Sequence, residues 1–347
     1  MRGIQFIAVL LLIASCKKPE APSIPERYEN GILVLNEGLY EQNNASMTFY
    51  DGAESFQLVF KSENGRGIGD TANDFDAYSL LGKEYIIVAV NLSSQIEIIE
   101  RKTLKVVAQI PLYDGINARQ PRDIDIYGTR AYVCNFDGTV AVIDLISYTI
   151  IDLIEVGANP DGLVIVGDYL YVSNSGGLDY PVYDSTMSVI NLSSLSLVET
   201  FETRINSTQM IVDEQGEIYL LSNGNYADVS AALLRIDPTT NTVVQTIEMP
   251  ISSMAYTYNG FYYYDEDEQA IYFYNTVTED INTSPFLSVA DYETFHGIKY
   301  DAQNDRLLCV DANGYVNSST VNAYSLSGEF LFQFQAGLLA TDMIFNN

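Results

Sequence analysis

The chain of 347 residues is predicted to form an all-β fold, a seven-bladed β-propeller of four-stranded antiparallel blades. One segment, residues 120–162, holds a complete unit of four short strands separated by turns that contain Gly or Asp. Similar strand ends and turns recur about every 45 residues, which is the length of a propeller blade. Within each unit the apolar residues alternate, and this pattern excludes a helical repeat.

The strands of this unit are runs of β-branched and aromatic residues. They are expected at residues 124–127, 130–134, 139–143 and 148–156. A single sheet of this size leaves one face and two edges uncovered. The unit therefore needs copies of itself as neighbours.

Two series of polar residues mark these copies and count about seven units. The first series ends each second strand and consists of Asn36, Asn91, Asn135, Asn174, Asn223, Asp265 and Asp311. The second series follows each third strand and consists of Asp51, Glu100, Asp144, Asn191, Asp237, Asn275 and Ser325. Asparagine at a strand end commonly caps a turn with its own side chain, so the first series has a structural interpretation.

The two ends of the chain complete each other in this scheme. Residues 31–36 have the pattern of a second strand with no first strand before it, and residues 339–345 have the pattern of a first strand with nothing after it. We expect the C-terminal strand to complete the first blade and close the ring, because closure leaves no open sheet edge. The propeller is thus expected to occupy residues 31–347.

The N-terminal residues have the pattern of an exported lipoprotein. Residues 1–15 carry an early Arg2 and an apolar run, and the sequence IASC that ends at Cys16 resembles a lipobox, in which the cysteine is acylated. Residues 16–30 contain three prolines and are expected to be the acylated cysteine and a flexible tether. The expected location is the outer membrane, lipid-anchored at the cell surface. A buried cysteine after an ordinary signal peptide is the alternative.

Composition narrows the classes of partner. The formal net charge is −29, and such a surface repels nucleic acid and anionic headgroups, so membrane contact is expected through the lipid anchor alone. Scattered carboxylates can equally serve solubility. Trp is absent, which argues against a WD-repeat propeller. Cys134 and Cys309 fall on second strands of distant blades and are expected to be core residues rather than a disulfide.

The candidate site lies on one rim of the ring. Because successive strands alternate in direction, the loops between second and third strands emerge on the same rim as the junctions between blades. The long irregular loops on this rim are residues 36–46, 174–186, 223–231 and 311–320. Function concentrates on loops that a rigid scaffold carries, so we expect the site here.

The candidate ligand-binding residues come from these junctions and loops. Side chains that open the innermost strands should point toward the mouth of the central channel, and tyrosines should surround them, which is typical of a ligand site rather than a metal cage. The set is Arg66, Asn73, Asp74, Arg122, Asp161, Asn174, Tyr180, Tyr183, Gln209, Asn223, Tyr226, His296 and Tyr315. Turn capping for Asn and Asp, blade packing for Tyr and a satisfied polar group for His296 are the structural alternatives.

No complete enzyme motif is found, so no catalytic residue, cofactor or metal is assigned, although a Ser-His-Asp arrangement around His296 stays open. The glycines at residues 65–69 lack the Lys-Ser/Thr of a phosphate loop, a single histidine cannot build a multi-histidine metal site, and no Gly-x-Ser-x-Gly elbow is present. An oxygen-ligand calcium site from Asp74, Asp161 and Asp342, of the kind used by some propeller hydrolases and lyases, stays open.

Several phrases resemble known propellers. Residues 138–144 (GTVAVID), 188–192 (SVINL) and 159–162 (NPDG) are similar to those of the YVTN or YncE-like seven-bladed propellers over most of the chain, although AYVCN and LYVSN stand where YVTN would. Residues 35–38 (LNEG), 43–46 (NNAS), 64–74 (NGRGIGDTAND) and 174–181 (NSGGLDYP) resemble a group of Bacteroidota surface lipoproteins that includes the BtuG-type proteins.

The resemblance to this group implies a function. Its BtuG-type members capture vitamin B12 and related corrinoids at the cell surface and pass them to a TonB-dependent outer-membrane transporter. A corrinoid, or another small-molecule nutrient, is therefore the expected ligand of a monomeric, non-enzymatic propeller. A metal-dependent lactonase or lyase and a propeller that binds a protein partner of the outer membrane are the alternatives.

Overall fold

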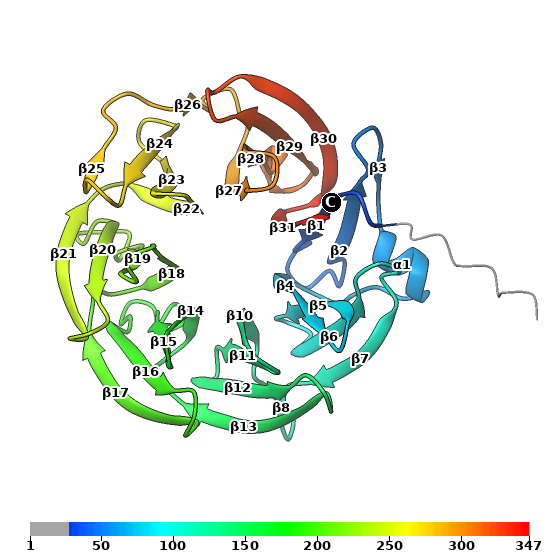
Figure 1. Cartoon of the computed structure of the whole chain (residues 1–347), viewed down its shortest axis with the longest axis horizontal. Helices are drawn as coiled ribbons and strands as arrows, with labels where there is room; N and C mark the ends of the chain where they lie inside the picture. The colour runs from blue at the N-terminus through cyan, green and yellow to red at the C-terminus, as the bar shows by residue number, and fades with distance from the viewer. Residues whose placement is uncertain (1–27, 347) are drawn as a thin grey trace, which may run out of the picture.

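The computed structural model describes residues 28–346 and confirms the predicted propeller: seven antiparallel sheets form a ring (Figure 1). The innermost strand of each sheet comes first in the chain, except in the blade that joins the two ends. Residues 1–15, Cys16 and most of the predicted tether lie outside the described residues. Within residues 28–346 no helix has the length and apolar character needed to cross a membrane.

The blades are numbered along the chain and their strands are given from the centre outward. Blade 1 consists of β31 (Ala340–Asn346), β1 (Gly31–Asn36), β2 (Ser46–Tyr50) and β3 (Ser55–Phe56). Blade 2 consists of β4 (Ala72–Leu80), β5 (Lys83–Val90), β6 (Gln95–Glu100) and β7 (Val106–Pro111). Blade 3 consists of β10 (Pro121–Tyr127), β11 (Arg130–Asn135), β12 (Thr139–Asp144) and β13 (Thr149–Glu155).

The other four blades repeat this order. Blade 4 consists of β14 (Pro160–Val166), β15 (Tyr169–Asn174), β16 (Thr186–Asn191) and β17 (Ser196–Glu202). Blade 5 consists of β18 (Ser207–Val212), β19 (Ile218–Ser222), β20 (Ala232–Asp237) and β21 (Thr242–Glu248). Blade 6 consists of β22 (Ile251–Thr257), β23 (Gly260–Asp265), β24 (Ala270–Asn275) and a divided outer edge of β25 (Asp280–Ile281) and β26 (Leu287–Ser288). Blade 7 consists of β27 (Phe295–Asp301), β28 (Arg306–Asp311), β29 (Ser318–Ser325) and β30 (Phe330–Leu338).

Three small elements lie between these strands. The strands β8 (Tyr113–Asp114) and β9 (Asn117–Ala118) form a short hairpin, and η1 (Asn313–Tyr315) is a single turn in the loop between β28 and β29. The helix α1 (Val59–Asn64) follows β3 and buries Val59 and Phe60. The sequence analysis did not predict α1, because six residues are too few to show a helical period.

Both series of polar markers coincide with strand ends. The residues Asn36, Asn135 and Asn174 end second strands, and Asn91 and Asn223 directly follow them. The amide of Asn36 donates to the hydroxyls of Ser46 and Thr48 in its own blade, whereas the amide of Asn91 donates to the Pro121 carbonyl of the next blade at 3.0 Å. Capping of this kind satisfies backbone and hydroxyl groups that the end of a buried strand would leave without partners.

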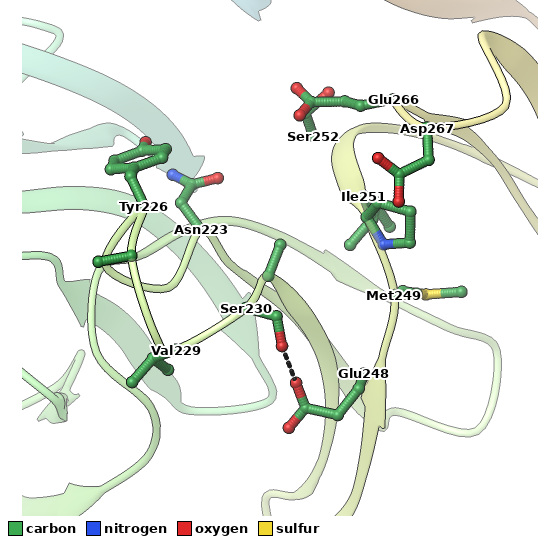
Figure 2. A pocket seen from close by; sticks show the side chains of 13 residues that line it. Asn223, Tyr226, Val229, Ser230, Glu248, Met249, Ile251, Ser252, Glu266 and Asp267 are labelled. Atoms are coloured by element: carbon green, nitrogen blue, oxygen red, sulfur yellow. Dashed lines mark hydrogen bonds between the residues drawn. The ribbon is translucent and has the colours of Figure 1, made fainter.

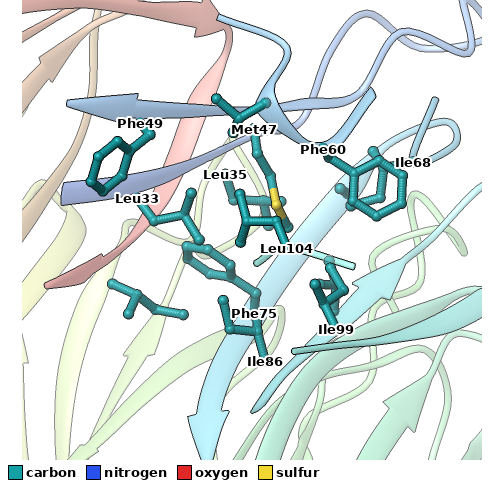
Figure 3. Close-up of a cluster of buried hydrophobic side chains, with 14 of the residues drawn as sticks. Leu33, Leu35, Met47, Phe49, Phe60, Ile68, Phe75, Ile86, Ile99 and Leu104 are labelled. Atoms are coloured by element: carbon teal, nitrogen blue, oxygen red, sulfur yellow. The ribbon is translucent and has the colours of Figure 1, made fainter. Parts of the chain in front are cut away.

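The core consists of seven apolar clusters, one between each pair of adjacent blades. Figure 3 shows the cluster between blades 1 and 2, where Leu33 and Met47 of blade 1 face Phe75 and Ile86 of blade 2. Alternate residues of each strand point into opposite clusters, as the period of two requires. Each blade is thus stabilised mainly by its two neighbours. Cys134 and Cys309 are buried and free in two of these clusters, as expected.

The predicted ring closure is confirmed by the pairing of β31 with β1. The two strands are antiparallel from Gly31 opposite Asn346 to Asn36 opposite Ala340. Arg101 of blade 2 donates to the side chain of Asn346 at 2.8 Å. Packing begins three residues before the expected start of the propeller, since Tyr28 is buried and lies edge-on to Phe49 at 5.2 Å.

Removal of residues 340–347 is predicted to destabilise the whole ring. The strand β31 carries Met343 and Ile344 into two different clusters, and each fully buried side chain of this size contributes about 1.5–3 kcal/mol. The loss approaches the total stability of an ordinary domain. We expect loss of cooperative unfolding, or a melting temperature lower by about 10 °C or more, in thermal denaturation. Truncation after Asn346, which keeps β31, is the control; equal melting of both truncations would contradict the proposed closure.

Candidate functional site

Every innermost strand carries a β-bulge within its first few residues. The register against the neighbouring strand shifts at this point in all seven blades. A bulge leaves an extra residue unpaired and re-aims its side chain. The residues at the bulges are Asn73, Arg122, Asp161, Thr208, Ser252, His296 and Thr341, which we call the bulge ring; all seven line one cavity of about 440 Å³.

The residues that follow the bulge ring form a second layer of the same cavity: Asp342, Asp74, Asp123, Gly162, Gln209, Ser253 and Gly297. Several of them join adjacent blades. The carboxylate of Asp74 accepts a hydrogen bond from the Ile124 amide at 2.9 Å, and that of Asp123 accepts one from the Leu163 amide at 2.8 Å. Side chains that bond the next blade hold the inner strands in place, so the wall of the cavity is fixed by the fold itself.

Gln209 makes the most complete of these links. Its side-chain oxygen accepts from the Met254 amide and its side-chain nitrogen donates to the Met254 carbonyl, both at 2.9 Å. Since both ends of its amide are occupied, Gln209 positions the wall between blades 5 and 6. It remains part of the lining, and so do Glu37, Asn223, Ile298 and Lys299.

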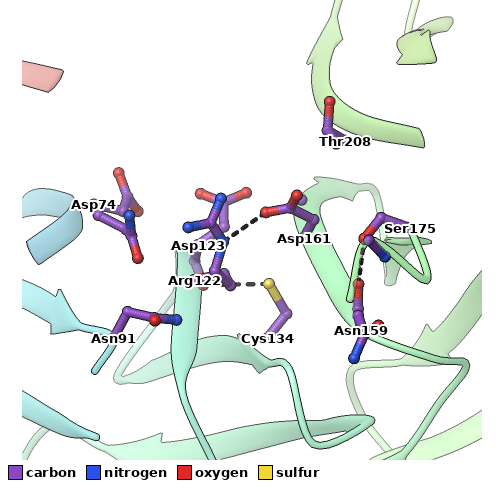
Figure 4. Close-up of polar contacts among 12 residues, drawn as sticks. Asp74, Asn91, Arg122, Asp123, Cys134, Asn159, Asp161, Ser175 and Thr208 are labelled. Carbon is purple, nitrogen blue, oxygen red and sulfur yellow. Dashed lines mark hydrogen bonds and ion pairs between the residues drawn. The ribbon is translucent and has the colours of Figure 1, made fainter. Parts of the chain in front are cut away.

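The two cations of the cavity are paired. The Arg122 guanidinium lies 2.7 Å from a carboxylate oxygen of Asp161 and 4.8 Å from the centre of the Phe136 ring (Figure 4). Lys299 lies 2.5 Å from Asp342. Three other acids line the cavity, Glu37, Asp74 and Asp123, and neither cation lies within hydrogen-bond distance of them. The cavity is therefore acidic overall, and it disfavours anionic ligands.

Burial and mutual repulsion raise the pKa of the acids near the axis. Burial is the main cause for Asp74, whose pKa lies well above its usual range, and the charges of Asp123 and Asp342 add to it. Burial also raises the pKa of Asp76, two residues further along the same strand, to about 7 and that of Asp123 to about 6. Like charges held close together cannot all ionise easily. At neutral pH this cluster keeps some of its protons.

Two further groups of the lining are shifted by burial. Burial raises the pKa of Glu37, although the charge of Arg122 and a hydrogen bond from Asn73 oppose the shift. Burial lowers the pKa of His296, which is therefore neutral at pH 7. The His296 ring meets the Tyr315 ring edge-on with 6.0 Å between centres. Tyr315 thus joins the loop between β28 and β29 to the edge of the cavity.

The structure brings together seven of the thirteen predicted residues. Asn73, Asp74, Arg122, Asp161, Gln209, Asn223 and His296 all line the cavity. The expectation that junction side chains point to the channel mouth agrees with this placement. The bulges explain it, because they turn one polar residue per blade toward the axis.

Two predicted residues lie elsewhere. Arg66 donates two hydrogen bonds to the buried carboxylate of Glu97 and packs over the Phe60 ring at 5.3 Å. Asn174 is fully buried; its amide donates to the hydroxyls of Thr186 and Ser188. Asn174 thus has the structural role expected of an asparagine at a strand end, Arg66 is held by an ion pair within blade 2 and its junction, and neither lines the cavity.

The predicted tyrosines stand on the loops around the opening. The Tyr180 and Tyr183 rings are 6.2 Å apart, and Tyr180 is exposed. Tyr226 lines a separate cleft between blades 5 and 6, with a volume of about 500 Å³ (Figure 2). This side cleft shares Asn223 and Ser252 with the central cavity. The two hollows are therefore neighbours on one rim.

The sequence analysis missed several lining residues: Glu37, Asp123, Thr208, Ser252, Lys299 and Thr341. For three of them the sequence contains a positional signal. Aligning the blade junctions on Asp161 of NPDG places Thr208, Ser252 and Thr341 at the same position in their own blades. Glu37 and Lys299 have no such marker, because one lies past a strand end and the other lies deeper in an inner strand.

The carboxylates considered as calcium ligands do not gather into one site. Among residues 28–346 no group of three or more His, Cys, Asp or Glu side chains has the arrangement of a metal site. Asp161 is paired with Arg122, whereas Asp342 is paired with Lys299.

Stability is predicted to fall as the pH rises from 5 to 8. The pKa of Asp76 is about 7 in the folded protein, above the usual value near 3.9 in an unfolded chain, so the folded state binds more protons across this range. Denaturant titrations at pH 5 and pH 8 measure the difference in the free energy of unfolding. The Asp76→Asn substitution should make this difference smaller, by about 1 kcal/mol. Asp280→Asn, at an exposed carboxylate of blade 6, should leave it unchanged, and an equal slope in all three proteins would contradict the buried cluster.

The fold is similar to that of several solved propellers at low sequence identity. A quinonprotein alcohol dehydrogenase-like protein from Bacteroides thetaiotaomicron is 16% identical with a TM-score of 0.64, over 92% of this chain and 79% of that chain. The hydrazine synthase of Kuenenia stuttgartiensis is 15% identical with a TM-score of 0.61, over 74% of this chain and 85% of that chain. The Pan2 WD40 domain of Neurospora crassa is 9% identical with a TM-score of 0.57, over 79% and 81%. These similarities show the fold alone.

Family membership is shown by the sequence of the propeller. No curated protein matches the chain. A family model described as "Domain of unknown function (DUF5074)" matches residues 30–323, which include strands of all seven blades. The chain therefore belongs to the DUF5074 family.

Proposed function

We propose that the protein is a non-enzymatic receptor that binds a nutrient ligand across the mouth of the central cavity, and that this ligand is a corrinoid. The bulge ring is the observation that supports the proposal most. Seven blades each turn one side chain toward one cavity; all seven side chains are polar, and the one cation among them, Arg122, is paired with Asp161. Such a ring suits a wide ligand with hydrogen-bonding groups on its periphery.

The chemistry of a corrinoid fits this lining. A corrinoid carries amide side chains around a flat macrocycle, and amides both donate and accept hydrogen bonds. Asn73, Thr208, Ser252 and Thr341 offer both kinds of group at the cavity wall. The cavity of about 440 Å³ admits one side of such a ligand, and the tyrosine-bearing loops stand where the rest would lie. Aromatic walls around a few polar groups are typical of binding sites for cofactors.

The proposal extends to location and partner. The lipobox-like sequence at Cys16 supports a lipid anchor at the outer membrane, facing the cell surface, from which the ligand would pass to a TonB-dependent transporter. Leu178, Tyr180 and Val182 are exposed in the loop between β15 and β16, on the rim that carries the cavity. Exposed apolar side chains beside a ligand site suit a transient contact with such a transporter.

An enzyme of the metal-dependent lactonase or lyase type is the second candidate. The raised pKa values of Asp74, Asp76 and Asp123 favour it, because perturbed carboxylates cluster at catalytic sites. Asp74 and Asp123 nevertheless bond the backbone of the next blade. That structural use of both side chains favours the receptor.

Binding of cyanocobalamin and cobinamide by the purified full-length protein is the first test. Calorimetry and the corrinoid absorption spectrum should both report saturable binding. Ser252→Trp places a large side chain in the bulge ring and should weaken binding about tenfold or more. Ser193→Trp, at an exposed turn of blade 4, is the matched control and should bind as the natural protein does. Absence of heat and of spectral change with both corrinoids would refute the proposed ligand.

Calcium separates the receptor from the enzyme. For the receptor, added Ca²⁺ or a chelator should leave the melting temperature unchanged, since a ligand that does not bind cannot stabilise the fold. Differential scanning fluorimetry measures this directly. A rise in melting temperature with Ca²⁺ that is lost in Asp74→Ala would favour the enzyme. Hydrolysis of a lactone by the calcium-loaded protein would establish it.

A further inference from the structure

The side cleft between blades 5 and 6 has a composition different from that of the central cavity. One wall is the loop between β19 and β20, the floor is the junction from Met249 to Ile251, and the other wall is the turn after β23. In Figure 2, Tyr226 and Asn223 stand on one side and Glu266 and Asp267 on the other. The cleft of about 500 Å³ is large enough for a small organic molecule.

The aromatic wall is held rigidly by its own loop. The side-chain oxygen of Asn225 accepts hydrogen bonds from the backbone amides of Ala227, Asp228 and Val229. Gly224 has a positive φ of 65°, and a Cβ at this position would lie 2.0 Å from the Val229 carbonyl oxygen. The loop therefore has one tight conformation. Tyr226 is presented from its tip with 76% of its surface exposed.

The floor of the cleft is apolar. Met249 and Ile251 are 8% and 1% exposed, and Pro250 lies between them at the start of blade 6. Val229 adds a further apolar side chain from the loop. Because Met249 and Ile251 are almost fully covered already, the partly exposed Pro250 and Val229 offer most of the apolar surface that a ligand with an apolar body can cover here.

The charge of the cleft is negative. No Lys or Arg is among its lining residues, which include Glu248, Glu266 and Asp267. Glu248 is engaged, since Arg204 lies 2.9 Å from its carboxylate and Ser230 donates to it at 2.6 Å. Within residues 28–346, neither the Glu266 nor the Asp267 carboxylate has a cation or a hydrogen-bond donor as partner. Two uncompensated carboxylates thus face an aromatic ring across an apolar floor.

We propose that the side cleft is a second binding site, for an organic cation with an ammonium or guanidinium group on an apolar stem. The stem would cover Pro250 and Val229, and the cation would lie between the carboxylates of Glu266 and Asp267 and the face of Tyr226. Cations are attracted both by carboxylates and by the electron-rich face of an aromatic ring. The site is distinct from the proposed receptor site, because Tyr226, Glu266 and Asp267, which would hold the cation, do not line the central cavity.

The shared residues Asn223 and Ser252 add a consequence. A molecule in the side cleft ends where the wall of the central cavity begins, so one ligand with a cationic arm can occupy both hollows. Two separate molecules would meet at this wall and affect each other's affinity. In both arrangements a cationic group binds in the side cleft, so the same titration tests both.

The test uses a matched pair of probes with the full-length protein. 2-Phenylethylammonium has the proposed chemistry, and 2-phenylethanol has the same skeleton without the charge. Titration followed by ligand-observed NMR and calorimetry should show saturable binding of the ammonium probe and at least about fivefold weaker binding of the alcohol. Glu266→Gln/Asp267→Asn should weaken the ammonium probe about tenfold. Tyr226→Leu should weaken it about two- to fivefold.

The control separates this site from the general acidity of the protein. The double variant Glu268→Gln/Asp280→Asn also removes two negative charges, but from exposed positions of blade 6 that do not line the cleft. Its binding of the ammonium probe should stay within about twofold of that of the natural protein. Equal weakening by both double variants, equal binding of the alcohol, or no saturable binding of the ammonium probe would each overturn the proposal. Corrinoid titration of the same variants is a separate readout, so failure there leaves this result unaffected.

Discussion

The pairing of β31 with β1 is the contact on which the rest of the molecule depends. It brings the last residues of the chain to the first blade, so that the ring has no open edge between blades 7 and 1. The strand β31 also supplies Met343 to the cluster between blades 7 and 1 and Ile344 to the cluster between blades 1 and 2. Because each blade is stabilised by its two neighbours, an unpaired β31 would weaken two interfaces at once. The circular order of the blades, and with it the central cavity, follows from this pairing.

The closed ring then determines where polar side chains can meet. Seven inner strands start around one axis, and the bulge in each strand turns one residue toward that axis. The next residue lies against the adjacent blade, which is why Asp74 and Asp123 are partly buried and bonded to backbone amides. One local irregularity, repeated seven times, therefore produces both the lining of the cavity and the links that hold the blades together. Asp74 and Asp123 serve both functions, because they line the cavity and also bond the next blade.

The sequence was sufficient to predict the fold because the signals of a blade are local. Strand alternation, polar strand ends and turn residues recur in each unit, and the mismatched ends of the chain indicate closure. The site could be predicted only in part. Asp161 and His296 were found because each opens a junction phrase, whereas Arg66 was misplaced because its partner Glu97 is 31 residues away and belongs to another strand. Long-range ion pairs of this kind leave no local pattern. Lys299 was missed for a similar reason, since its partner Asp342 is in a different blade.

Charge gives the two neighbouring hollows different selectivity. The central cavity contains Arg122 and Lys299, each already paired with an aspartate, so it offers no free cation, and its hydroxyls and amides lie beside further acids of the lining. A neutral ligand rich in amides loses little there, because its hydrogen bonds to water are replaced. The side cleft lacks a lining cation and keeps two free carboxylates, so a cationic group gains most. The strongly acidic surface repels anions from both hollows before they bind. If both proposals hold, neutral and cationic ligands would bind at different places on one rim, and anionic ligands would be disfavoured at both.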